Sequence, residues 1–547
     1  MSDSPPPSAH VDTFCRDGLP TAREWPELVF DLPELQYPER LNCAVELLDK
    51  VIERLGADRP CLVAPGSPVW TYGDLLRVSN QIANVLVHDY AIVPGNRVML
   101  RGPNTQWLVA CWIGVIKAGA VAVTTAAMLR SVELTKIAEI ANVDLVLCDA
   151  RFTDSLIEAD IPRLHVVEYG GSAGLTKAIA GKSAEFIAVD TAAVDVALLA
   201  FTSGTTGRPK ATVHFHRDVL AIADSFSTHI LKPKPTDVFT GTPPLAFTFG
   251  LGGLVVFPLR VGASTLLLEK ASPEQLAEFI ADYNVTVCIT APTAYRAIVN
   301  SGKVDRLSRL RRAVSAGEHL PVTTWQSIFA ATGLRIIDGV GATEMLHIFI
   351  ASAEDEIRPG STGRVVPGYV AAVLDEHGVP LPPGIPGRLA VKGPTGCRYL
   401  SDSRQCEYVQ AGWNITGDIF VQDVDGYFWY QARSDDMIVS SGYNIAAPEV
   451  EQALMAHPDV EECGVVGLSD DHRGQLVSAF IVLRSGIEPH AGRTLALQDF
   501  VKSRIAPYKY PRQIFFVDEL PKTGTGKLQR HRLPELVSGL RLEPDAP

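Results

Sequence analysis

An apolar run that opens into a glycine- and hydroxyl-rich loop is the strongest constraint in this sequence. Residues 194–201 are almost entirely apolar, which is typical of a buried strand. Residues 202–210 then read Thr-Ser-Gly-Thr-Thr-Gly-Arg-Pro-Lys. Because glycines allow a tight turn and hydroxyls and cations complement negative charge, this loop suits a polyphosphate. An ordinary turn is the alternative, which the two cations at the end disfavour. The candidate phosphate-binding residues are Thr202, Ser203, Gly204, Thr205, Thr206, Gly207 and Lys210.

Segments typical of strands and helices alternate on both sides of this loop. Expected strands at 97–100, 120–124 and 144–148 are separated by expected helices at 107–117 and 131–140. Alternation of this kind predicts an α/β fold with a parallel sheet. A chain of 547 residues, 46% of them hydrophobic, is long enough for a large domain and a smaller one.

Two further expected strands, 311–315 and 334–338, end in small residues. Since the carboxyl ends of neighbouring parallel strands meet at one edge of a sheet, they would leave a flat slot for an aromatic base. Just beyond, Thr343 can reach a phosphate and Glu344 can hold a divalent cation that bridges phosphate oxygens. A glycine-rich turn with a capping Thr-Glu pair is the alternative. The slot residues are Ala316, Gly317, Glu318, Asp338, Gly339, Val340 and Gly341.

Two motifs nearer the C-terminus add candidate residues. Asp418 follows a glycine and can accept hydrogen bonds from ribose hydroxyls, with a plain Asx turn as the alternative. Lys527 ends the sequence Thr-Gly-Thr-Gly-Lys, which would carry one lysine on a mobile tip, with an exposed turn as the alternative. Between the two motifs the composition changes near residue 433, and the remainder predicts a compact α+β unit.

Composition excludes several classes of protein. The net charge of -13 argues against a nucleic-acid partner. Nine cysteines without a Cys-x-x-Cys pair indicate neither a zinc site nor a disulfide framework, and His214 and His216 leave a metal pair only as a weak alternative. The apolar segment 245–259 is too short to span a membrane, and the N-terminal residues lack a signal-peptide pattern. A cytoplasmic protein without a membrane partner is predicted.

In this order, the blocks resemble those of the adenylate-forming enzymes, the family of acyl-CoA synthetases, peptide-synthetase adenylation domains and luciferases. The resemblance covers nearly the whole chain. It implies an α/β fold with a large N-terminal domain, residues 1–433, of two α/β-layered sheets plus a small distorted β-barrel. It also implies a small mobile α+β C-terminal domain, residues 434–547.

The resemblance further implies a role for each candidate residue. The phosphate loop, the slot and Thr343 would hold ATP, with Asp418 and Arg433 on the ribose. Lys527 would be catalytic together with Thr343 and Glu344, and Glu344 would also bind the metal. Asp435 would be the hinge, and Ser441, Gly442 and Tyr443 would line a CoA tunnel. Val340, Ala432 and Val439 depart from the residues most frequent in the family.

The implied reaction joins a carboxylic acid to CoA with ATP and Mg²⁺. Attack of the carboxylate on the α-phosphate would give an acyl-AMP and pyrophosphate, and a thiol would then displace AMP. Two anions approach each other in the first step, so a cation such as Lys527 is required between them. The alternatives are a stand-alone adenylating enzyme that loads a carrier protein, and a nucleotide sensor without turnover. A monomer or a homodimer is expected.

The acid pocket is expected between the phosphate-loop sheet and the slot. Aromatic walls over a floor of small residues favour a flat ring, although phenylalanines that serve only as core remain the alternative. Residues 341–349 resemble the benzoate–CoA ligase branch, and residues 35–42 resemble the 2-aminobenzoate–CoA ligases. The hypothesis is 2-aminobenzoate (anthranilate) first and benzoate second, with neutral His347 facing the amine. The wall residues are Ala246, Phe247, Phe249, Ala316, Gly317, Val340, Gly341 and His347.

Overall fold

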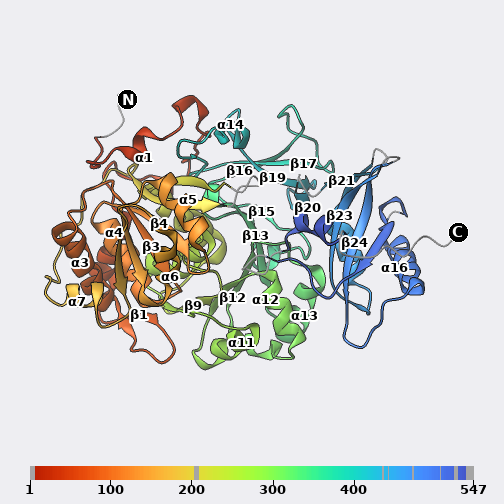
Figure 1. Ribbon diagram of the computed structural model, residues 1–547, viewed down its shortest axis with the longest axis horizontal. Helices are drawn as coiled ribbons and strands as arrows, with labels where there is room; N and C mark the ends of the chain where they lie inside the picture. Colours follow the sequence, from red (N-terminus) through yellow and green to blue (C-terminus); the bar gives the residue numbers. More distant parts are fainter. Residues whose placement is uncertain are drawn as a thin grey trace. The chain divides into compact units, whose positions relative to one another are not determined.

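The computed structural model forms two compact units (Figure 1). It describes residues 7–202, 208–433, 437–440, 443–470, 473–505, 507–522 and 528–537. The larger unit comprises Met1–Ala371 and Ala390–Thr416, and the smaller one comprises Ala372–Leu389 and Gly417–Pro547. The division expected after residue 433 stays a prediction.

The first sheet of the larger unit has six strands in the order β6-β5-β3-β4-β7-β8. All neighbours are parallel except β7 and β8, which form an antiparallel hairpin. The sheet is therefore mixed rather than wholly parallel, because the seven residues between β7 and β8 are too few for a crossover. The strands are β3 (Arg97–Gly102), β4 (Val121–Ala126), β5 (Leu145–Asp149), β6 (His165–Tyr169), β7 (Val196–Thr202) and β8 (Lys210–Phe215).

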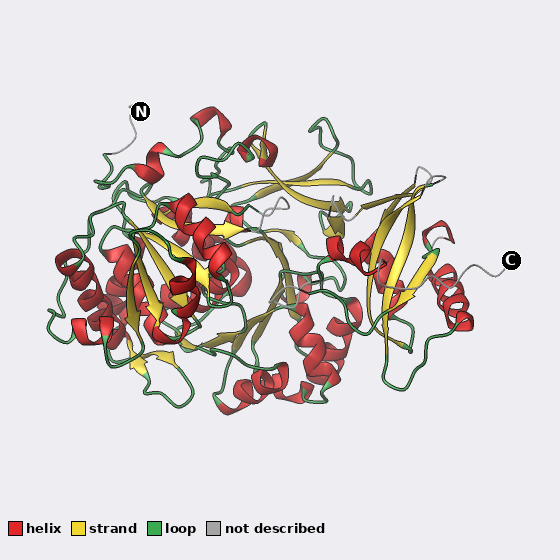
Figure 2. Ribbon diagram, viewed as in Figure 1, coloured by secondary structure: helices red, strands yellow, loops and turns green. Residues whose placement is uncertain are grey.

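Helices cover both faces of this sheet (Figure 2). Alternate residues of a strand point to opposite faces, so Met99 packs in one core with α5 (Ser131–Ala141) and α6 (Asp154–Ala159). Leu100, next in the chain, lines a small cavity together with Trp112 of α4 (Gln106–Lys117) on the other face. Helix α3 (Tyr72–Asp89) packs against α4 and begins with a capping box at Thr71.

The second sheet has nine strands in the order β15-β14-β13-β12-β11-β9-β10-β1-β2. Strands β9 to β13 are parallel neighbours, and β14 and β15 complete the edge in antiparallel pairing. The segment Gly339-Val340-Gly341, which was expected to follow a strand, lies within β13. The strands are β1 (Pro60–Val63), β2 (Trp70–Thr71), β9 (Val238–Gly241), β10 (Ser264–Leu266), β11 (Val287–Thr290), β12 (Arg312–Ala316), β13 (Ile336–Gly341), β14 (Ile348–Ala351) and β15 (Arg364–Val365).

Helices connect and cover the second sheet. Helices α11, α12 and α13 share one buried core with β10 to β13. After β8, α8 continues directly into the π-helical η5. The elements are α8 (His216–Ile222), η5 (Ala223–Leu231), α9 (Thr248–Leu251), η6 (Gly252–Val256), α10 (Phe257–Val261), α11 (Pro273–Asp282), α12 (Pro292–Asn300) and α13 (Val322–Thr332).

Two smaller sheets follow along the chain. The third has the order β16-β17-β19-β18, with β20 also paired to β19, and it forms the curled half-barrel. The fourth, in the smaller unit, has the order β22-β21-β24-β23 with β25 beside β24, and α15 and α16 pack on it. The strands are β16 (Val370–Leu374), β17 (Gly387–Lys392), β18 (Val409–Gln410), β19 (Trp413–Gln422), β20 (Phe428–Arg433), β21 (Met437–Ser440), β22 (Tyr443–Ala446), β23 (Val460–Asp470), β24 (Gly474–Leu483) and β25 (Gln513–Phe516), and the helices are α15 (Ala447–Met455) and α16 (Ala491–Arg504). The expected α/β fold class is confirmed.

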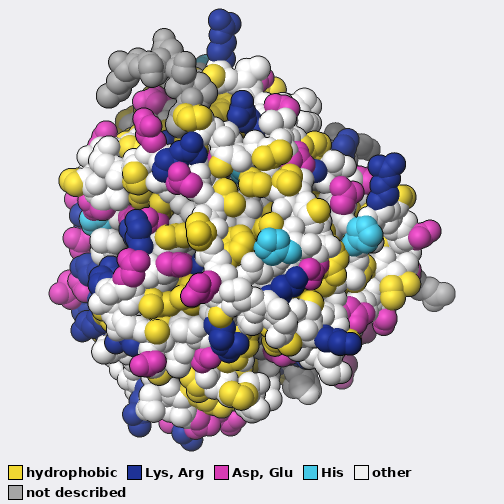
Figure 3. Space-filling view, turned by 90° about the vertical axis from the view of Figure 1, so that its left-hand side faces the viewer, with side chains coloured by type: hydrophobic (Ala, Val, Ile, Leu, Met, Phe, Trp, Pro, Cys, Tyr) yellow, Lys and Arg dark blue, Asp and Glu magenta, His cyan; other side chains and the backbone are white. Residues whose placement is uncertain are grey.

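Surface and cysteine chemistry agree with the composition. On the face of the larger unit shown in Figure 3, side chains of both charges are interspersed with apolar ones. None of the described helices combines the length and apolarity needed to cross a membrane. All nine cysteines are free thiols, and only Cys406 is exposed.

Candidate active site

The phosphate loop connects the two strands of the β7–β8 hairpin. Thr202 and Lys210 are directly paired at its base, so the last residue of one strand faces the first residue of the next. The Thr202 hydroxyl is buried and has no hydrogen-bond partner among the described residues. Residues 203–207, which carry the predicted Ser203, Gly204, Thr205, Thr206 and Gly207, lie outside the described residues.

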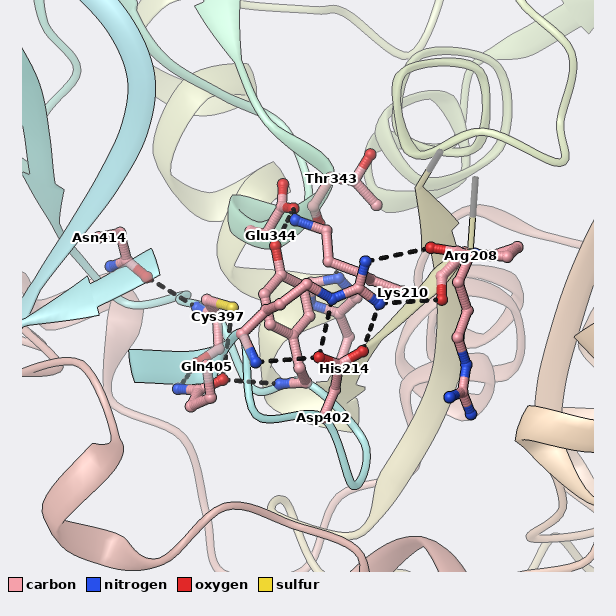
Figure 4. A network of polar contacts seen from close by, with 12 residues as sticks. Arg208, Lys210, His214, Thr343, Glu344, Cys397, Asp402, Gln405 and Asn414 are labelled. Carbon is pink, nitrogen blue, oxygen red and sulfur yellow. Dashed lines mark hydrogen bonds and ion pairs between the residues drawn. The ribbon is translucent and has the colours of Figure 1, made fainter. Parts of the chain in front are cut away.

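Lys210 and Glu344 lie close together (Figure 4). Tyr399 contacts both of them. The Lys210 Nζ lies 3.9 Å from the Glu344 Oε1 and 4.5 Å from the centre of the Tyr399 ring. The Tyr399 hydroxyl donates a short hydrogen bond to the same Oε1. Burial and, after it, the Glu344 charge raise the pKa of Tyr399, so the hydroxyl keeps its proton. The structure thus brings together Lys210 and Glu344, which lie far apart in the sequence.

The Thr343–Met345 turn, η8, is held through its backbone. The Thr343 carbonyl accepts from the His214 Nε2 at 2.9 Å and from the Leu346 N–H at 3.1 Å. Since a carbonyl only accepts, Nε2 must carry the proton of the His214 ring. The Thr395 hydroxyl donates to the Met345 carbonyl at 2.8 Å. These contacts stabilise a turn that leaves Leu346 with a φ of 67°.

His214 comes from β8, four residues beyond Lys210 on the same strand. Full burial lowers the pKa of its imidazole to about 4, so the ring is neutral at physiological pH. The neighbouring His216 accepts from the Cys43 N–H at 3.2 Å through its Nδ1. The two rings therefore serve separate hydrogen bonds, and the described residues contain no cluster of three or more His, Cys, Asp or Glu that could hold a metal.

The segment that begins at Asp402 holds the C-terminal end of the phosphate loop in place (Figure 4). The Arg404 guanidinium donates to the Arg208 carbonyl at 3.1 Å and to the Pro209 carbonyl at 3.3 Å. Asp402 forms an ion pair with Arg404 at 2.5 Å and so holds the guanidinium in place. Neighbouring side chains continue this layer, because Gln405 and Asn414 accept from the backbone N–H groups of Tyr399 and Cys397.

The slot is predicted where β12 and β13 end side by side. Ala316 and Gly339 are direct partners, and Ser315 pairs with Asp338. Gly317 follows with a φ of +91°, and a side chain built there would meet no atom within 4 Å. Burial raises the pKa of Asp338, and its Oδ1 has no hydrogen-bond partner among the described residues. Open space at Gly317 leaves room for a ligand edge at the end of β12.

His347 lies in a cage of aromatic rings. The ring centres of Phe257, Phe226 and Phe249 lie 4.6, 5.4 and 5.6 Å from that of His347. Burial lowers the pKa of His347 to about 3, against a smaller opposing effect of the Phe249 backbone, and neither ring nitrogen makes a well-formed hydrogen bond to the described residues. Because both nitrogens are shielded from solvent in this structure, a bound acid could reach them only after a neighbouring side chain moves.

The other wall residues differ in their surroundings. Phe247 is 37% exposed, whereas Phe249 packs on His347, so the two side chains have different surroundings. Ala246 is buried and its carbonyl accepts from Thr124 at 2.8 Å. Gly341 lies against the His347 backbone, where a Cβ would come within 2.6 Å of the carbonyl oxygen.

The predicted ribose residues pair within the smaller unit. Asp418 on β19 is the direct partner of Arg433 on β20, and their Oδ1 and Nη1 lie 3.1 Å apart. Gly417 has a φ of +78°, which explains the glycine before the acid. Asp435, Ser441, Gly442 and Lys527 lie outside the described residues, and of Tyr443 only its place at the start of β22 is described.

Comparison with known proteins identifies the family. The model of AMP-binding enzymes matches residues 48–399, and the model of their C-terminal domain matches residues 449–527. The chain belongs to the AMP-binding enzyme family. It is similar to the benzoate–CoA ligase of Thauera aromatica, with 33% identity over 92% of this chain and 97% of the relative. The 3-hydroxybenzoate–CoA ligase of Aromatoleum sp. (strain CIB) is 31% identical over 92% of this chain and 98% of its own length.

A solved structure gives the same picture. An anthranilate CoA ligase in complex with anthranoyl-AMP superposes with a TM-score of 0.86 at 32% identity, covering 93% of this chain and 100% of that one. This AMP-binding enzyme is thus an AMP-forming acid–CoA ligase, which uses ATP and works through an acyl-adenylate.

Three contacts of this AMP-binding enzyme were not predicted from the sequence. Nothing in the sequence indicated that Tyr399 would reach Glu344, that His214 would reach Thr343, or that Arg404 would hold the loop exit. The one hint in the sequence was the pair His214 and His216, because polar residues on a buried strand are unusual.

Proposed function

We propose that this enzyme converts an aromatic carboxylate to its CoA thioester, with 2-aminobenzoate preferred and benzoate next. The aromatic cage around His347 is the observation that carries the proposal, because flat rings pack well against such walls. The relatives named above act on benzoate, 3-hydroxybenzoate and anthranilate, which supports an aromatic acid.

His347 is our candidate for recognising the ortho amine. A neutral imidazole has one donor and one acceptor nitrogen, and in His347 neither makes a well-formed hydrogen bond to the part of the chain that the structure describes. A buried polar atom without a partner costs free energy, which an amine or a hydroxyl on the substrate ring would offset. Benzoate offers no such group, so it would bind without using this histidine.

The proposed metal site contains one carboxylate. Tyr399 and Lys210 both address Oε1 of Glu344, and Oε2 has no partner among the described residues. Mg²⁺ commonly takes one or two protein carboxylates together with phosphate oxygens and waters, so this donor set fits it. When bound, Mg²⁺ would neutralise charge on the pyrophosphate. Lys210, Thr343 and the phosphate loop would contact the phosphates, while Asp418 and Arg433 would hold the ribose.

Lys527 is proposed as the cation between the carboxylate and the α-phosphate, with Asp435 as the pivot between residues 1–433 and residues 434–547. Lys527→Ala should lower pyrophosphate release by orders of magnitude, whereas thioester formation from supplied acyl-AMP and CoA should largely survive. Equal loss of both half-reactions would contradict the assignment.

The substrate is tested by specificity constants for anthranilate, benzoate, 3-hydroxybenzoate and octanoate, measured by pyrophosphate release with and without CoA. We expect anthranilate to lead and octanoate to be poor. His347→Phe keeps an aromatic ring, although a larger one, and removes both nitrogens, so it should reduce kcat/KM for anthranilate about 10-fold or more and affect benzoate much less. A preference for octanoate would refute the aromatic pocket, and benzoate ahead of anthranilate would reverse the order within it.

A carrier protein is the second candidate for the thiol acceptor. Adenylation without CoA consumption would favour it, and stoichiometric acyl-CoA formation would exclude it. The same assay excludes a nucleotide sensor, because a sensor would release no pyrophosphate with any acid.

A further inference from the structure

Tyr399 occupies a position that the reaction does not by itself explain. Its side chain is buried, it comes from the segment before β18, and it contacts both Glu344 and Lys210. Its hydroxyl takes Oε1 of the carboxylate, and its ring face lies 4.5 Å from the ammonium of the lysine. One side chain thereby fixes the two charged groups assigned to the phosphates and the metal.

The two contacts have separate chemical origins. A hydroxyl that donates to one oxygen of a carboxylate fixes the rotation of the carboxylate plane, as partners of metal-binding carboxylates commonly do. A lysine over an aromatic face is attracted by the ring quadrupole, which does not depend on the hydroxyl. Removal of the hydroxyl should therefore release Glu344 and leave Lys210 in place.

We propose that Tyr399 is a positioning residue that holds Oε1 of Glu344 and thereby presents Oε2 to the divalent cation. The proposal rests on Glu344 as the metal ligand of the proposed function. It makes Tyr399 responsible for the coupling between metal and nucleotide, and not for binding of the aromatic acid.

The test measures this coupling without turnover. The Kd of a non-hydrolysable ATP analogue is determined calorimetrically with and without Mg²⁺, and the ratio of the two values reports the coupling. Tyr399→Phe keeps the ring for Lys210, so the Kd without Mg²⁺ should stay within about 2-fold of wild type. The improvement brought by Mg²⁺ should shrink about 10-fold, in the range known for partners of metal ligands. Tyr399→Leu loses the ring as well, so it should also weaken binding without Mg²⁺.

Tyr295→Phe is the matched control. Tyr295 is likewise buried in the larger unit, and its hydroxyl lies within hydrogen-bond distance of the Val314 and Cys288 carbonyls, at 3.3 and 3.4 Å. This variant should keep the wild-type coupling. A p-aminophenylalanine at position 399 retains both the ring and an N–H donor, so it should restore most of the coupling lost in Tyr399→Phe. If Tyr399→Phe folds poorly, the p-aminophenylalanine variant provides the test in its place.

Glu344→Gln separates the inference from the proposed function. If Glu344→Gln leaves the coupling unchanged, Glu344 is not the metal ligand and both ideas fail. If Glu344→Gln removes the coupling while Tyr399→Phe retains it, the positioning role alone is wrong. In the Glu344→Gln background, Tyr399→Phe should have no further effect on the coupling, and an additional loss would show that Tyr399 acts by another route.

Discussion

At the scale of single residues, the predicted active-site groups depend on buried neighbours that bind no substrate. His214 is fully buried on β8, and its Nε2 is hydrogen-bonded to the Thr343 carbonyl at 2.9 Å. It therefore connects the strand that carries Lys210 to the turn that carries Glu344. A hydrogen bond of this kind contributes about 1 kcal/mol, and its loss would leave the Thr343 carbonyl held by the Leu346 N–H alone.

Replacement of His214 tests this link. His214→Gln can place an amide N–H near the position of Nε2, whereas His214→Leu has similar volume and no donor. We expect His214→Leu to lower kcat for adenylation about 10-fold or more with a smaller change in the KM for the acid, because the turn and not the acid pocket is released. His214→Gln should recover most of kcat. Equal effects of both variants would mean that ring shape, and not the hydrogen bond, is what matters.

At the scale of elements, the end of β13 packs very closely against the backbone of the turn that follows it. The register of β13 against β14 shifts between Val340 and Gly341, and a Cβ on Gly341 would lie 2.6 Å from the His347 carbonyl oxygen. Backbone atoms cannot rotate away as a flexible side chain could. The glycine is therefore needed for close approach, since its φ is not among the positive values.

Gly341→Ala should accordingly lower the free energy of unfolding by about 1–3 kcal/mol, the usual cost of overpacking. It should also lower kcat/KM for benzoate, because the same displacement reaches His347 and its aromatic cage. Gly181→Ala is the control, since a Cβ there meets no atom within 4 Å and the glycine has no positive φ. Denaturant unfolding of both variants gives the comparison, and equal stability of the two would contradict the clash.

At the scale of the whole molecule, several histidines are buried in the neutral form. Burial lowers the pKa of His214 and His319 to about 4 and of His216 and His347 to about 3. The unfolded chain protonates these groups near pH 6.5, whereas the folded chain does not until pH 4 or 3. The unfolded state therefore binds more protons in this window, and stability is lost as the pH falls.

Each such histidine should lower the free energy of unfolding by about 1.4 kcal/mol per pH unit below pH 6.5. His216→Asn removes one of them, while the amide oxygen can still accept from the Cys43 N–H. Urea unfolding at pH 7.5, 6.0 and 5.0 should show that the free energy of unfolding of the wild type falls steeply with falling pH. For the variant, the slope of this free energy against pH should be smaller by the equivalent of about one bound proton. Parallel slopes would show that His216 is protonated in the folded state.

The proposed division after residue 433 bears on the order of the two half-reactions. Proline at position 435 fixes φ at the proposed pivot. Asp435→Pro should therefore still make acyl-AMP, as measured by pyrophosphate release, but transfer it to CoA much more slowly. Full overall activity would rule out Asp435 as the pivot.

The sequence by itself determined the α/β class, the buried strand before the predicted phosphate loop and the strand before Gly317, because these depend on local hydrophobic pattern. It also paired Asp418 with Arg433 in one role, and β19 and β20 place them opposite each other. The antiparallel direction of β8 was less evident from the sequence, since a hydrophobic pattern does not indicate strand direction.

Only the tertiary structure decided which distant side chains meet. Tyr399 lies 55 residues from Glu344, and His214 lies 129 residues from Thr343. A buried hydroxyl or imidazole carries no mark of its partner in a single sequence, because the partner is chosen by the packing of separate strands and turns. The same packing closed the aromatic cage over His347, so a pocket residue expected from its motif is shielded until its neighbours move.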